Sequence, residues 1–309
     1  MLLIKSIPEI YSIEIREVNM IKRLVKGINR KIENMTKNAY KFIFLRINFR
    51  SIPSLKKNTR NTTNGYIVSL TSWEPRFNTL PIALKSLLFQ TRKPDRIILY
   101  LGNDVNPKSI PYEIKRFRKK GVEIKFVNEN LRAHKKYYYA MKEYPDSTVI
   151  TVDDDVIYSP FTISSLIKCS KRNKKCVCAR RTHRMTFSGG KLLPYKDWKY
   201  EVTDIKPRFN LLGTGVGGIL YPPHSLHMDL FNKEELKRIA FTNDDLWLKG
   251  MEMLRNTKTK SVKCLWKHPI EILNEDEYSL FNINVINNEN DRIFERLQER
   301  YPGILDKCL

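Results

Sequence analysis

The stretch Thr148-Val149-Ile150-Thr151-Val152-Asp153-Asp154-Asp155 decides the fold prediction, because a β-branched apolar run ends directly in three carboxylates. Its first five residues favour a buried strand, since Val, Ile and Thr pack well on a pleated surface. Adjacent carboxylates repel one another, so their place at a strand end indicates a neutralising divalent cation. In an extended backbone Asp153 and Asp155 would point the same way. The alternative is a solvated acidic turn before the helix expected after Pro160.

Strand and helix signals alternate around this stretch. Short β-rich runs and longer helical patterns follow one another at 66–70, 79–89, 96–101, 111–120, 122–127 and 132–143. Such alternation predicts a mostly parallel sheet covered by helices on both faces. Ligands of these sheets bind at the carboxyl ends of the strands, which is where the three Asp residues lie.

Composition and charge limit the classes of protein to consider. The chain has 309 residues, 41% of them hydrophobic, and a formal net charge of +23. This hydrophobic content supports a real core, while the longest apolar runs fall short of the ~18 residues of a membrane span. Five cysteines without a C-x-x-C pair, and a start without an export signal, predict a reduced, cytoplasmic location.

The charge is concentrated near the start of the chain. Residues 1–60 hold 14 Lys plus Arg and 4 Glu, a net +10, which leaves +13 for the remaining 249 residues. Apolar residues recur every three or four positions over 21–35 with Lys and Arg between them, which predicts an amphipathic helix. It either packs on the body of the protein or contacts an anionic membrane or partner, and both interpretations stay open. Residues 51–64 are typical of a linker.

A second acidic site opens an apolar helical stretch in Phe241-Thr242-Asn243-Asp244-Asp245. One of its carboxylates can cap that helix, while the other can act as a general base. Upstream, residues 213–218 contain four glycines, which let the backbone approach a ligand closely. This loop lacks the Lys-Ser/Thr of a P-loop.

Taken in chain order, these motifs resemble the nucleotide-sugar glycosyltransferases of the GT-A fold, particularly the family-2-like bacterial enzymes of surface-polysaccharide synthesis. The resemblance covers about residues 66–266. It rests on five segments: Val68-Ser69-Leu70-Thr71-Ser72, Ser86 to Thr91, the D-x-D element at Asp153–Asp155, the glycine loop, and Asn243-Asp244-Asp245 in place of the family's Glu-Asp motif.

The resemblance implies an α/β fold, with a GT-A, Rossmann-like and mostly parallel sheet flanked by helices. A basic amphipathic helical extension with its linker would occupy residues 1–64, and the glycosyltransferase domain 65–309. Within that domain we expect a nucleotide-binding half at about 65–160, an acceptor half at about 161–270 and a C-terminal helical tail at 271–309.

Roles for individual residues follow from the resemblance. Asp153 and Asp155 would hold Mn²⁺ or Mg²⁺ at the donor diphosphate, with His268 as a late third ligand. Asp245 would be the catalytic base, with Asp244 as the alternative. The residues implied to bind the nucleotide sugar are Thr71, Arg76, Asp104, Arg132, Lys135, Asp153, Asp154, Gly217 and Gly218.

The predicted function is metal-dependent transfer of a sugar, with inversion, from a nucleotide-sugar donor to a glycan or lipid-linked acceptor. The protein would act in the cytoplasm, with peripheral contact to the inner face of the cell membrane through residues 1–60. A metal-dependent nucleotidyltransferase, which releases pyrophosphate, is one alternative, and a non-enzymatic basic nucleic-acid or membrane-binding protein is another. No nucleic-acid partner is expected, because the aromatics form no RNA-binding signature and acidic clusters occupy the ligand edge.

Overall fold

The computed structural model describes residues 27–28, 31–55, 64–204, 206–264, 266, 269–272 and 288–309. It divides the chain into two compact units, Met1–Ile47 and Asn48–Leu309. In the first unit residues 31–46 are helical, and the described part of the amphipathic stretch predicted at 21–35 is helical as well. No helix in the described part of the chain is long and apolar enough to cross a bilayer.

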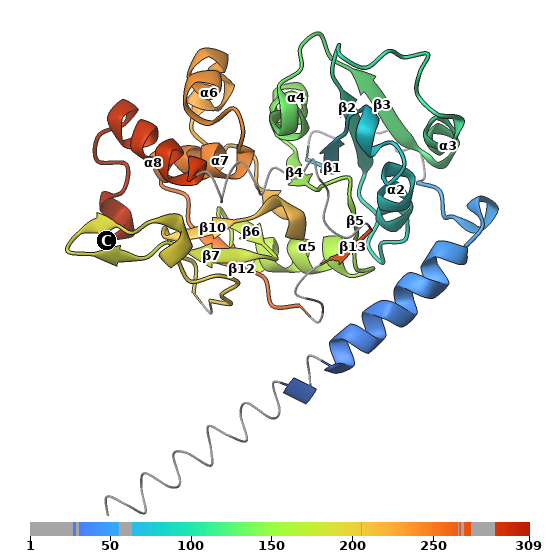
Figure 1. Ribbon diagram of the computed structural model, residues 1–309, viewed down its shortest axis with the longest axis horizontal. Helices are drawn as coiled ribbons and strands as arrows, with labels where there is room; N and C mark the ends of the chain where they lie inside the picture. Colours follow the sequence, from blue (N-terminus) through green and yellow to red (C-terminus); the bar gives the residue numbers. More distant parts are fainter. Residues whose placement is uncertain are drawn as a thin grey trace, which may run out of the picture. The chain divides into compact units, whose positions relative to one another are not determined.

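A seven-stranded sheet forms the centre of the second unit, in the order β12-β6-β11-β4-β1-β2-β3 (Figure 1). β1 pairs in parallel with β2 and β4, whereas β11 runs antiparallel to both of its neighbours. The mostly parallel sheet expected from the sequence is therefore confirmed. Its strands are β1 Tyr66–Thr71, β2 Arg96–Leu101, β3 Val122–Phe126, β4 Thr148–Thr151, β6 Val177–Ala179, β11 Ile219–Tyr221 and β12 Thr259–Ser261.

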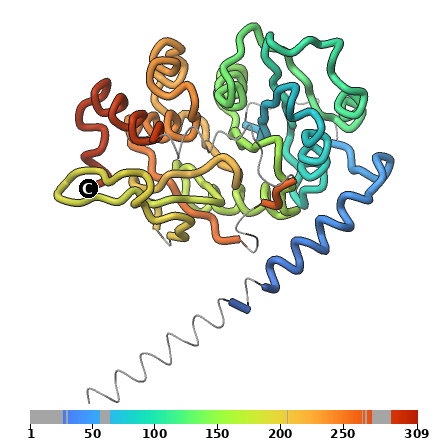
Figure 2. Tube along the Cα trace, in the orientation of Figure 1, coloured from blue at the N-terminus to red at the C-terminus, as the bar shows by residue number. Residues whose placement is uncertain are grey.

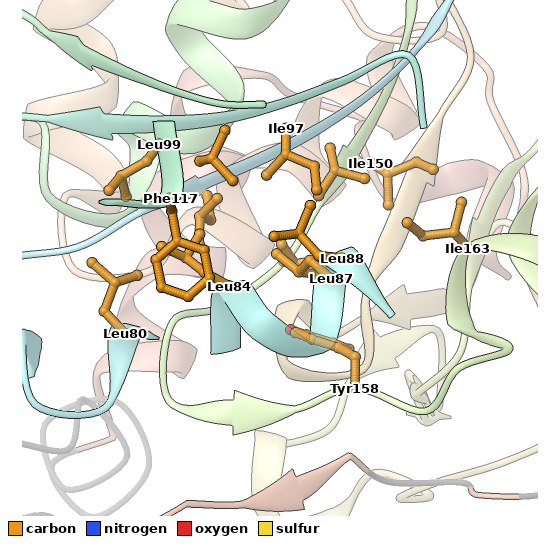
Figure 3. Close-up of a cluster of buried hydrophobic side chains, with 14 of the residues drawn as sticks. Leu80, Leu84, Leu87, Leu88, Ile97, Leu99, Phe117, Ile150, Tyr158 and Ile163 are labelled. Carbon is orange, nitrogen blue, oxygen red and sulfur yellow. The ribbon is translucent and has the colours of Figure 1, made fainter. Parts of the chain in front are cut away.

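Helices cover both faces of the parallel strands. On one face α2 places Leu84 and Leu87 against Ile97 of β2 and Ile150 of β4 (Figure 3). On the other face Ala140 of α4 packs with apolar residues of β1 and β2. The helices of the second unit are α2 Leu80–Leu88, α3 Tyr112–Lys115, α4 Lys135–Glu143, α5 Thr162–Arg172, α6 Lys233–Ala240, α7 Asp244–Leu254 and α8 Glu289–Arg300.

A separate apolar cluster holds the C-terminal helices together around the fully buried Trp247 of α7. Figure 2 shows α8 beside α7, and the contact is close: a Cβ added to Gly250 would lie 2.9 Å from Leu297 Cδ2. The remaining strands form three two-stranded sheets, pairing β5 Val156–Ile157 with β13 Ile270–Glu271, β7 Thr182–Arg184 with β10 Leu211–Gly213, and β8 Phe187–Ser188 with β9 Lys191–Leu192.

Some predicted elements differ locally from those observed. The helix expected at 111–120 is α3 followed by the 3₁₀ segment η3 Arg116–Lys120, and the one expected at 132–143 begins with the 3₁₀ segment η4 Arg132–His134. Residues 51–55, predicted to begin a linker, instead contribute Ile52 and Leu55 to the core of the second unit. The spacing of apolar residues within this segment does not predict its burial, because Ile52 and Leu55 pack against residues that are distant in the sequence.

Candidate active site

The three consecutive carboxylates lie directly after β4, at the edge where the parallel strands end. β4 ends at Thr151, and Asp154 and Asp155 lie in a bend. Strand alternation does not continue through this bend, so the extended backbone on which the shared direction of Asp153 and Asp155 was predicted is absent there. The bend gives each carboxylate its own partner: Lys136 Nζ lies 2.7 Å from Asp153 Oδ1, the Ser72 hydroxyl donates to Asp154, and Arg76 forms an ion pair with Asp155.

Lys136 joins this cluster to the second acidic motif. Its buried ammonium lies 3.0 Å from Asp244 Oδ2, at the start of α7, as well as beside Asp153. Burial lowers the pKa of Lys136, but the carboxylates of Asp153, Asp244 and Asp245 outweigh burial and hold this pKa well above its ordinary value. Lys136 is thus a charged member of the site that the sequence did not single out.

Asp245 occupies the first turn of α7 and faces the glycine loop. The backbone N–H of Gly215 donates to both carboxylate oxygens, at 2.9 Å and 3.1 Å. The N-cap of α7 is Asn243, whose side chain accepts the N–H of Leu246 at 3.2 Å, so neither aspartate is needed as the cap. Burial and the neighbouring Asp244 raise the pKa of Asp245 to about 8. Asp245 as a whole residue is nevertheless only half-buried.

The glycine loop contains the 3₁₀ segment η6 Gly215–Gly217 between β10 and β11, and only part of it faces the acidic site. A Cβ added to Gly215 would lie 3.1 Å from Lys136 Nζ, 3.2 Å from an oxygen of Asp245 and 3.4 Å from an oxygen of Asp153. At Gly217 a Cβ would instead lie 2.8 Å from the backbone nitrogen of Arg181. At Gly218, where φ is +87°, the nearest atoms belong to Thr162 and Leu166 of α5.

Several of the residues expected to bind the nucleotide sugar lie at or near the ends of β1 and β2. The Thr71 hydroxyl donates to the Tyr100 carbonyl at 2.8 Å. Asn130 joins two of the others, because its amide donates to Asp104 at 2.7 Å and its carbonyl oxygen accepts from Lys135 at 2.6 Å. Asn130 thus bridges a carboxylate and an ammonium.

The backbone N–H of Arg132 donates to the same Asn130 oxygen at 2.9 Å, but its side chain has a different contact. Its guanidinium stands over the Phe241 ring, 4.7 Å from the centroid, at the connection between α6 and α7. Its backbone φ of 51° is in the left-handed region, which is uncommon for a residue with a side chain. The Arg132 side chain therefore joins η4 to the α6–α7 connection.

A family model described as Glycosyl transferase family 2 matches residues 74–232, which is more than half of the chain. The chain belongs to glycosyl transferase family 2. It is therefore a glycosyltransferase with the GT-A fold, and the matched residues include the D-x-D bend, Lys136 and the glycine loop. Asp244 and Asp245 lie beyond the end of the match.

Solved glycosyltransferases are similar to the chain at 10% identity. They are the mannosyltransferase PcManGT from Pyrobaculum calidifontis with GDP-Man and Mn²⁺ (TM-score 0.42, covering 94% of this chain and 84% of that one), glucosyl-3-phosphoglycerate synthase from Mycobacterium tuberculosis (0.43, 77% and 80%), and GalNAc-T7 with UDP, GalNAc and Mn²⁺ (0.44, 80% and 52%). No curated protein matches the chain.

A divalent cation fits the D-x-D bend of this family 2 enzyme as a two-carboxylate site. Asp155 Oδ1 is buried and has no hydrogen-bond partner, so the bend carries an oxygen available as a ligand. Within the described residues no three His, Cys, Asp or Glu side chains form a metal cage. Mg²⁺ and similar ions are commonly held by one or two carboxylates and completed by substrate phosphates. His268 lies outside the described residues.

Proposed function

We propose that this family 2 enzyme moves a sugar from a nucleotide-sugar donor to a hydroxyl of a glycan or lipid-linked acceptor, with Mn²⁺ or Mg²⁺ and with inversion at the anomeric carbon. The observation that carries the proposal is the position of Asp245. Asp245 is half-buried, and the D-x-D residue Asp153 is among its charged neighbours: a Cβ added to Gly215 would lie 3.2 Å from an oxygen of Asp245 and 3.4 Å from one of Asp153. A base for the acceptor and an anchor for the donor diphosphate thus adjoin one another.

Asp245 suits the role of base better than Asp244. The carboxylate of Asp244 is buried and forms an ion pair with Lys136, so its charge is already compensated inside the protein. Asp245 accepts only a backbone N–H among the hydrogen bonds of the described residues, and its raised pKa favours proton uptake near neutral pH.

The reaction we propose is a single displacement. The acceptor hydroxyl gives its proton to Asp245, and its oxygen forms a bond to the anomeric carbon. The bond from that carbon to the diphosphate breaks, and its electron pair leaves with the nucleoside diphosphate. The chemistry that a divalent cation bound by Asp153 and Asp155 would supply is Lewis-acid stabilisation of this leaving group. Lys135 and Arg76 are the side chains we assign to the phosphates.

The setting we propose is bacterial surface-polysaccharide synthesis at the inner face of the cell membrane. In the helical residues 31–46 the side chains of Ile32, Met35, Phe42 and Ile43 are exposed. Their spacing places them on one face of the helix, and the segment also carries Lys and Arg. An apolar helical face with cationic neighbours suits peripheral attachment to anionic lipid, where a lipid-linked acceptor would be found.

A nucleotide-sugar panel tests the function directly. Purified protein with Mn²⁺ should be stabilised by one UDP-, GDP- or CDP-sugar in thermal unfolding, because a ligand that binds the native state raises the melting temperature. The same donor should yield nucleoside diphosphate rather than pyrophosphate, and Asp155→Ala should abolish turnover. Asp146→Ala, which changes an exposed acid paired with His224, is the matched control. Full turnover in Asp155→Ala would refute the metal role.

A further inference from the structure

The ammonium of Lys136 lies between acids that come from distant parts of the chain. It contacts Asp153, after β4, at 2.7 Å and Asp244, on α7, at 3.0 Å. Asp245 is also close: a Cβ added to Gly215 would lie 3.1 Å from this ammonium and 3.2 Å from an oxygen of Asp245. Buried carboxylates that lie close together strongly favour a cation between them, and the protein itself supplies this cation as the ammonium of Lys136.

The backbone around Lys136 is fixed on two sides. The Ser69 hydroxyl of β1 donates to the Lys136 carbonyl. Two residues earlier in the chain, His134 Nε2 donates to the carbonyl of Ala240, at the end of α6, over 2.9 Å. The start of α4 is thus bonded to the sheet and to the end of α6.

A conflict arises at Asp153, because the oxygen that accepts from Lys136 belongs to a carboxylate assigned to the metal. Two cations that share one carboxylate repel each other, and this repulsion is strong where water is excluded. We propose that Lys136 is a positioning residue, the resident counter-cation of Asp153, and that a divalent cation reaches Asp153 in competition with it while Asp244 retains the ammonium. This inference rests on the metal site of the proposed function.

Mn²⁺ alone, without any donor, is the probe. Full-length protein is titrated with Mn²⁺, and electron paramagnetic resonance measures the free Mn²⁺. Lys136→Met should bind Mn²⁺ about tenfold more tightly than wild type. This is the size of effect expected when a charge-assisted hydrogen bond no longer competes for the carboxylate. A merely structural lysine would leave affinity unchanged or lower it, and either result would overturn the proposal. Lys249→Met is the matched control, because it also removes a buried lysine from an ion pair, with Glu252 at 2.8 Å, but outside the site. It should leave Mn²⁺ affinity as in wild type.

A second variant decides the matter if Lys136→Met does not fold. Asp244→Asn removes one of the two ion pairs of the ammonium and leaves the one with Asp153, so Mn²⁺ should bind more weakly than in wild type. Equal or tighter binding would contradict the competition. Absence of Mn²⁺ binding in both wild type and Lys136→Met would also refute this inference. Sugar transfer is measured in a separate assay, which tests the proposed function. Mn²⁺ competition without sugar transfer would refute the proposed function and leave the role of Lys136 intact.

Discussion

The backbone N–H of Gly215 donates to both oxygens of Asp245, at 2.9 Å and 3.1 Å. This contact joins the loop before β11 to the first turn of α7, so the carboxylate has a fixed orientation before any ligand arrives. A preoriented base contributes to catalysis because little reorganisation is needed in the transition state. The first two predictions follow from this pair.

Asp245→Asn should lower kcat by about 10²- to 10⁴-fold, the contribution usual for a general base, while donor binding is retained. The amide is isosteric and can still accept the Gly215 N–H, but it cannot take the acceptor proton. Release of nucleoside diphosphate and donor-dependent thermal shift measure the two effects separately. A smaller loss in Asp245→Asn than in Asp244→Asn would assign the base to Asp244.

Gly215→Ala and Gly217→Ala should fail in different ways. The new methyl at Gly215 enters the space among Lys136, Asp153 and Asp245 at 3.1 to 3.4 Å, so we expect kcat to fall with a small change in melting temperature. The methyl at Gly217 meets the Arg181 backbone at 2.8 Å, which should cost about 1–3 kcal/mol of stability, as overpacking does. Kinetics and urea denaturation of both variants would test this. Equal loss of stability in both would contradict the assignment of Gly215 to the site.

His134 should make the protein sensitive to acid. Burial lowers its pKa to about 4, and its ring accepts from Tyr137 and donates to Ala240 in the neutral form. Below the pKa that His134 has in the unfolded chain, the unfolded chain binds a proton at this histidine, whereas the folded chain does not bind it until the pH is near 4. Stability from this residue is therefore complete above about pH 6.5 and declines by about 3 kcal/mol toward pH 4.

Urea denaturation at pH 7, 5.5 and 4 measures this decline. His134→Gln cannot titrate, so its free energy of unfolding should approach or exceed that of wild type as the pH falls. His224→Gln, at an exposed histidine, is the control and should follow wild type. A constant difference between His134→Gln and wild type across this range would show that the buried ring does not resist protonation.

Deletion of residues 1–47 should weaken binding to vesicles that contain anionic lipid, while donor binding is kept. The cut must come before Phe49, Ile52 and Leu55, which pack in or against the core of the second unit, so a longer deletion would confuse loss of attachment with unfolding. Sedimentation with neutral and with anionic vesicles, at low and at high salt, measures the effect. Undiminished binding by the shortened protein would exclude the helix as the attachment site.

Local patterns in the sequence were sufficient for the elements that position the site. The strand before the three aspartates, the helix at 79–89 and the apolar stretch after Asp245 appear close to where they were expected, as β4, α2 and α7. Each is determined by periodicity or by β-branched residues within one short segment, which is information that a single sequence carries.

Local sequence patterns do not predict which of Lys135 and Lys136 contacts the acidic residues. Both lysines are buried at the start of α4, yet Lys135 donates to Asn130 near Asp104 while Lys136 contacts Asp153 and Asp244. Adjacent helical residues point about 100° apart, and nothing local indicates which direction meets the acids. The resemblance implies Lys135 for the donor site and does not distinguish Lys136, which the structure places between two acids.

The sequence by itself determined the family, the mostly parallel sheet and the acidic motifs at the strand edge, because these depend on residue types at short spacings. Tertiary structure alone decided which partner each carboxylate has, that Asn243 and not an aspartate caps α7, and that Gly215 is the glycine facing the site. The physical reason is that burial and the Coulomb interaction act between atoms a few ångströms apart, whereas Lys136 and Asp244 are brought within 3.0 Å only by the folding of everything between them.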